Sequence, residues 1–61
     1  MPMTPTQLRQ ALRALGLTQR ALAARLGVHV QTVKKWLAGE RRISEPVAIL
    51  IRTWLKARRP R

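Results

Sequence analysis

The stretch of sequence that decides the fold is Leu17 to Gly39, LTQRALAARLGVHVQTVKKWLAG. Thr18 is a favoured N-cap residue, and the apolar residues that follow it keep helical spacing as far as Leu26. Gly27 can take the left-handed conformation that ends a helix. A second helical run opens at His29 and closes at Gly39. The stretch therefore predicts two short helices joined by a turn of about three to four residues.

The second of these helices has two faces of different character. One face is apolar and consists of Val33, Trp36 and Leu37. The opposite face is small, polar or basic, and its residues are Gln31, Lys34, Lys35 and Ala38. A helix, a short turn containing glycine and a second helix with a basic outer face are typical of the DNA-binding helix-turn-helix motif.

The same residues resemble a known family. The segment LTQRALAARLGVHVQTVKKWLAGERR is similar to the helix-turn-helix of the phage Cro and repressor (XRE-like) family of transcriptional regulators. The residues that carry this resemblance are Leu17-Thr18-Gln19, Leu22-Ala23, Leu26-Gly27-Val28, Thr32-Val33, Trp36 and Gly39. The resemblance extends from about Leu8 to Leu55 and implies a lambda-repressor-like fold. One residue departs from the family pattern: His29 stands at the cap of the second helix, where the family usually has Ser or Thr.

Helices are also expected on both sides of the motif. Thr4, Pro5 and Gln7 form a capping-box start. An apolar stripe follows and ends before Gly16; it consists of Leu8, Ala11, Leu12 and Leu15. Ser44 is placed to cap a last helix that runs to about Ala57, with an inner face of Val47, Leu50, Ile51 and Trp54. Both Trp36 and Trp54 are expected to pack in the core.

These elements predict one compact all-α domain of four helices over residues 1–61, with the helix-turn-helix at its centre. Residues 1–3 are expected to be loose, and residues 58–61 are expected to form a basic tail. A chain of this length buries only about 60% of its unfolded surface, so its stability margin is thin.

Charge is the most pronounced feature of the composition. Thirteen Lys and Arg residues face two acids, for a net charge of +11 and a pI near 12.0. This balance favours a polyanionic partner. The chain has no apolar run near the ~18 residues of a transmembrane span, and its N-terminus does not resemble a signal peptide. We therefore expect no membrane insertion. We expect a cytoplasmic location.

The base-reading residues are expected on the second helix of the motif, over residues 30–38. Gln can pair bidentately with adenine, Lys can donate to guanine, and Val can contact a thymine methyl group. By position and by family resemblance, the residues expected at base edges are Val30, Gln31, Thr32, Lys34 and Lys35. The alternative interpretation of this face is a solvated surface that contacts nothing.

Phosphate contacts position a protein on DNA without reading its sequence. The residues expected to make them are Gln19, Arg20, His29, Arg41 and Arg42. Further candidates, which could equally be solvated charges, are Arg25, Lys56, Arg58, Arg59 and Arg61. His29 could cap its helix poorly and contact phosphate through its ring, or it could be a neutral surface residue.

An apolar residue on the outer face of the last helix points to self-association. Ile49 falls between Arg52 and Lys56 on the helical wheel, although an isolated exposed isoleucine is also normal. The family resemblance implies dimerisation through the last helices. The interface is expected to contain Ile49, Leu50, Arg52, Thr53 and Trp54.

The sequence thus predicts a sequence-specific DNA-binding transcriptional regulator, an operon autorepressor that binds a palindromic operator as a homodimer in a bacterial cell. Catalysis, a cofactor, a metal and a small-molecule substrate are not expected, because Glu40 and Glu45 are the only carboxylate side chains and the chain has no Cys and one His. One alternative is an antitoxin or a phage or mobile-element regulator, for example an anti-CRISPR-associated one, with a protein partner. The alternative from another class is a basic helical protein that binds nucleic acid non-specifically or acts on membranes.

Overall fold

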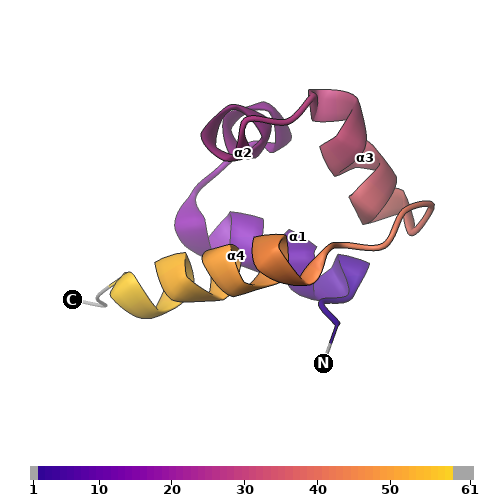
Figure 1. Ribbon diagram of the computed structural model, residues 1–61. Coiled ribbons are helices and arrows are strands. Elements are labelled where there is room, and N and C mark those ends of the chain that lie inside the picture. Colours follow the sequence, from indigo (N-terminus) through magenta and orange to yellow (C-terminus); the bar gives the residue numbers. More distant parts are fainter. Residues whose placement is uncertain (1, 59–61) are drawn as a thin grey trace.

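The computed structural model describes residues 2–58, which form four α-helices (Figure 1). α1 spans Pro5–Leu15, α2 spans Gln19–Leu26, α3 spans Val30–Ala38 and α4 spans Glu45–Ala57. No strand occurs in this part of the chain. α1 and α4 lie along one another, and α2 and α3 form the other side of the molecule (Figure 1). The predicted all-α fold with a central helix-turn-helix is confirmed.

The helices begin and end where local sequence signals place them. The Gln7 backbone N–H donates to Thr4 Oγ1 at 3.1 Å and the Thr4 N–H donates to Gln7 Oε1 at 3.0 Å, which completes the expected capping box. Thr18 caps α2 in the same way, with its Oγ1 accepting the Ala21 N–H at 3.0 Å. Gly27, at φ 73°, adopts the left-handed conformation that turns the chain from α2 into α3.

Ser44 differs from its prediction. It stands at the N-cap of α4 in an extended conformation, but its side chain makes no capping hydrogen bond. The second residue of α4 is Pro46, which has no N–H, so only the third residue, Val47, has an N–H within reach of this cap, and the bond is not formed. The start of α4 instead carries Glu45, whose negative charge suits the positive end of the helix dipole.

The core forms where α1 packs against α3 and α4 and where α2 packs against α3. Every helix contributes buried apolar side chains, which are Leu8, Ala11, Leu12, Leu22, Ala23, Val33, Trp36, Ala48 and Ile51. Because α1 contacts both α3 and α4, it fixes the second helix of the motif against the last helix of the fold.

Two predictions about burial are wrong. Met3 was expected to be loose, but it is 7% exposed and belongs to the core cluster together with Ile43. Leu50 was placed on the inner face of α4, but it is 40% exposed, because the buried arc of α4 is centred on Ala48 and Ile51. Trp54 is half-buried and packs against the edge of the core. Met1 and residues 59–61 of the predicted tail lie outside the described residues.

Candidate nucleic-acid interface

α3 presents a basic face to solvent because its apolar face is held in the core. Val33 and Trp36 are buried. On the opposite side, Gln31, Lys34 and Lys35 are exposed. Val30 and Thr32 are half-buried at the edges of the exposed face. The predicted base-reading residues therefore share one helix, and those with amide or ammonium groups are the most accessible.

The start of α3 is capped by His29. Its Nδ1 atom accepts the backbone N–H of Gln31 at 3.2 Å, and its backbone is extended at φ −72° and ψ 145°. An imidazole nitrogen that accepts a hydrogen bond carries no proton, so the neutral ring in this arrangement holds its proton on Nε2. His29 therefore supplies the capping bond that a Ser or Thr oxygen usually makes, in contrast to the poor cap that the sequence suggested.

The predicted phosphate-contacting residues lie on two segments beside α3. Gln19 and Arg20 occupy the first turn of α2, which packs on α3, and both are exposed. Arg41 and Arg42 are exposed in the loop that joins α3 to α4. Within residues 2–58, none of these arginines pairs with an acidic side chain, and neither do Lys34 and Lys35. Their positive charge is therefore available to attract a polyanion.

Other arginines are engaged within the fold. The Arg25 guanidinium lies over the Trp54 ring, 4.8 Å from its centroid, in a cation–π contact. Arg58 Nη1 donates to the Ala14 carbonyl oxygen at 2.6 Å, near the end of α1. Arg52 Nη1 lies 3.7 Å from Glu45 Oε2. The sequence placed Arg25 and Arg58 among the phosphate candidates, because contacts between residues far apart in the chain, Arg25 with Trp54 and Arg58 with Ala14, leave no local signal.

The predicted dimer-interface residues lie within one stretch of α4, residues 49–54, which we call the strip. Ile49 is 53% exposed, and Thr53 is also exposed, with its hydroxyl donating to the Ile49 carbonyl oxygen at 2.8 Å. Arg52 and Trp54 are half-buried, the first beside Glu45 and the second under Arg25. The large apolar side chains that the strip leaves exposed are those of Ile49 and Leu50.

Residues 2–58 contain no group of three or more His, Cys, Asp or Glu side chains that could hold a metal ion. No helix among them has both the length and the apolar character needed to cross a membrane. What these residues do hold is a cationic surface around α3.

The geometry of α2 and α3, with a buried inner face and an exposed basic outer face, agrees with comparison against known families. The Helix-turn-helix family model matches residues 8–52, which run from α1 into α4 and make up most of the chain. The chain therefore belongs to this family and is an XRE/Cro-like helix-turn-helix DNA-binding regulator, a class whose members are generally not enzymes. Comparisons with curated proteins and with solved structures give no match.

Proposed function

We propose that this protein is a sequence-specific transcriptional repressor that places α3 in the major groove of its operator. The observation that carries the proposal is the exposed row of Gln31, Lys34 and Lys35 on a helix whose other face is held in the core. Because the helix is fixed by packing, the face that carries these side chains has one orientation relative to the rest of the fold. Gln31 suits adenine and the lysines suit guanine, while the methyl groups of half-buried Val30 and Thr32 suit contact with a thymine methyl group.

The proposed phosphate contacts flank this helix. Gln19 and Arg20 begin α2, which packs on α3, and Arg41 and Arg42 lie in the loop that follows α3. His29 contributes a phosphate contact through Nε2–H, since its Nδ1 atom is occupied by the Gln31 backbone. These contacts orient the protein on the duplex and carry no sequence information of their own.

The proposed operator is palindromic and is bound by two copies of the chain. Exposed Ile49 and Leu50 are the apolar centre of the proposed contact, and Arg52, Thr53 and Trp54 are its surroundings. Two copies related by a two-fold axis would read half-sites about one helical turn apart, roughly 34–36 Å. Such a protein acts in the bacterial cytoplasm, where it represses its own operon and needs neither a cofactor nor a metal.

Selection from a random duplex DNA library at about physiological salt tests this function, because non-specific binding is weak there. The expected result is one enriched motif, a palindrome whose half-sites are a helical turn apart. A variant with Gln31, Lys34 and Lys35 all changed to Ala is the matched control, and it should enrich no such motif. Tight, salt-sensitive binding by the unaltered protein without any enriched motif would contradict sequence reading and favour non-specific nucleic-acid binding.

A further inference from the structure

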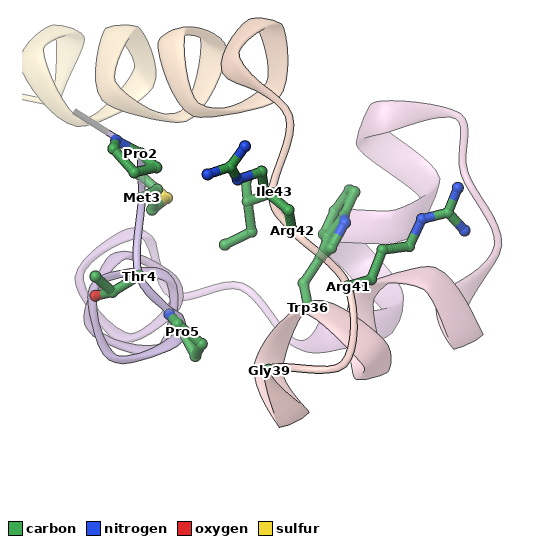
Figure 2. A pocket seen from close by; sticks show the side chains of 9 residues that line it. All are labelled: Pro2, Met3, Thr4, Pro5, Trp36, Gly39, Arg41, Arg42 and Ile43. Atoms are coloured by element: carbon green, nitrogen blue, oxygen red, sulfur yellow. The ribbon is translucent and has the colours of Figure 1, made fainter.

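A hollow lies between the segment that precedes α1 and the loop that follows α3 (Figure 2). Its volume is about 310 Å³. The apolar residues that form its bed include Met3, Trp36 and Ile43, which are 7%, 4% and 3% exposed. Because these side chains belong to the core cluster, the bed is held in place by packing and does not depend on a ligand to form it.

The charges around the hollow have one sign. Arg41 and Arg42 both line it, no acidic residue does, and neither arginine pairs with an acid in the described part of the chain. Figure 2 shows the Arg42 side chain extending toward Pro2 and Met3, while Arg41 lies on the other side of the Trp36 ring. A guanidinium group beside an apolar bed matches a carboxylate attached to an apolar body, since Arg can bind a carboxylate through two parallel hydrogen bonds.

The size of the hollow limits the body of the ligand. At about 310 Å³ it is at the small end of the roughly 300–1,000 Å³ that small-molecule pockets occupy. An apolar cavity of about 150 Å³ is enough to hold benzene. A single ring or a branched chain of similar size, carrying one carboxylate, therefore fits the bed and reaches Arg42.

We propose that this hollow binds a small amphipathic organic anion, a carboxylate on a single ring or on a branched chain of that size, and that the bound anion weakens DNA binding. The anion is a regulatory ligand and not a substrate. The claim that the anion binds is supported by the hollow alone. Its effect on DNA rests on the proposed function, because the guanidinium that holds the carboxylate is then withdrawn from phosphate, and the coupling is reciprocal.

Nuclear magnetic resonance of the whole chain, without DNA, tests the site. Benzoate and phenylacetate are titrated at constant ionic strength, and the Met3 and Ile43 methyl signals and the Trp36 indole N–H signal are followed. Trp54 does not line the hollow, so its indole N–H signal is the internal control. Acetate, which lacks the ring, and benzyl alcohol, which lacks the charge, are the matched control ligands.

The two ring acids should give saturable shifts at the hollow, and both control ligands should bind at least about tenfold more weakly. Arg42→Gln should weaken benzoate binding by about tenfold, while Arg9→Gln, on the exposed face of α1, should not change it. Absence of saturable shifts with both ring acids would overturn the site. Equal shifts with acetate would also overturn it, because they would show attraction of any anion.

The second measurement is the affinity for the selected operator, with benzoate or acetate added at the same ionic strength. Benzoate should lower the affinity by about tenfold in the unaltered protein and should have little effect in Arg42→Gln. If benzoate shifts the signals of the hollow but leaves operator affinity unchanged, the regulatory part of the proposal is overturned and the site stands. If no operator is selected, the proposed function fails, and the titration without DNA still decides whether the site exists.

Discussion

At the scale of single residues, His29 is the departure from the family pattern that the structure explains. Its Nδ1 atom accepts the Gln31 N–H at 3.2 Å, which satisfies one of the donors that a helix start leaves without a partner. The ring therefore stabilises the turn of α3 that carries the first predicted base contacts. The imidazole ring of His29 makes the capping hydrogen bond that a hydroxyl oxygen usually makes.

Replacing His29 by Ala should lower the free energy of unfolding by about 0.5–2 kcal/mol, because the Gln31 N–H loses its acceptor. His29→Ser is the matched control, since its hydroxyl oxygen can accept the same N–H, and it should retain most of the stability. Urea denaturation followed by far-ultraviolet circular dichroism measures both variants. Equal destabilisation by Ala and Ser would show that the imidazole stabilises the protein by something other than the cap.

Gln31 should read one base pair. Gln31→Ala is expected to cost ~1–3 kcal/mol of binding free energy on the selected operator and to relax specificity at a single position. The measurement is the affinity of the variant for a set of operators, each carrying one base-pair change. Gln10→Ala, an exposed glutamine on α1, is the control and should bind every sequence as before. An equal loss of affinity on all sequences would show that Gln31 contacts the DNA backbone and not a base.

At the scale of the element, α4 separates core from surface within two residues. Ile51 is 1% exposed, whereas Ile49 is 53% exposed. Ile51→Val removes a methyl group from close-packed surroundings and should cost about 0.5–1.5 kcal/mol of stability. Ile49→Val makes the same chemical change on the same helix and should stay within about 0.5 kcal/mol.

Thermal unfolding of the two variants, followed by circular dichroism, compares these costs directly. A change of about 1 kcal/mol shifts the Tm of a domain this small by roughly 4–8 °C, so the difference is measurable. Similar shifts for Ile49→Val and Ile51→Val would contradict the orientation of α4 and would place the two residues in equivalent surroundings.

The helices themselves could be predicted from the sequence because their ends depend on neighbouring residues. The bond between Thr4 and Gln7 spans three residues, and Gly27 ends α2 through its own backbone conformation. The outer face of α3 could be predicted for a similar reason: helical periodicity alone separates Gln31 and Lys35 from Val33. Local signals of this kind need no knowledge of the tertiary structure.

What could not be predicted depends on contacts between distant parts of the chain. Met3 follows no periodic pattern, and its burial requires a space that exists only after α1 meets the loop after α3. The same holds for Arg25 over Trp54 and for Arg58 at the Ala14 carbonyl. From charge alone, Arg25, Arg58 and Arg41 are equal candidates for phosphate contact. Only the packed structure shows that Arg25 and Arg58 already contact other parts of the chain.

At the scale of the whole molecule, the strip on α4 predicts how copies of the chain assemble. Ile49→Asp places a charge in the proposed apolar contact and should reduce the complex on the selected operator from two copies to one. Light scattering of the protein–DNA complex measures the number of copies. Thr6→Asp introduces the same charge on the exposed start of α1 and should leave two copies bound. An unchanged mass for Ile49→Asp would exclude this strip as the interface.

The net charge of +11 predicts a steep salt dependence of DNA binding. With about six phosphate contacts per complex, a plot of log affinity against log salt concentration should have a slope near −5, measured by fluorescence anisotropy of labelled operator DNA. Arg41→Gln should make the slope shallower by about two, because an unpaired loop cation is lost from each of the two bound copies. Arg58→Gln removes the same charge, but the Arg58 guanidinium donates to the Ala14 carbonyl, so its slope should match that of the unaltered protein. Equal flattening by both variants would mean that total charge, and not the cations flanking α3, determines how this protein holds DNA.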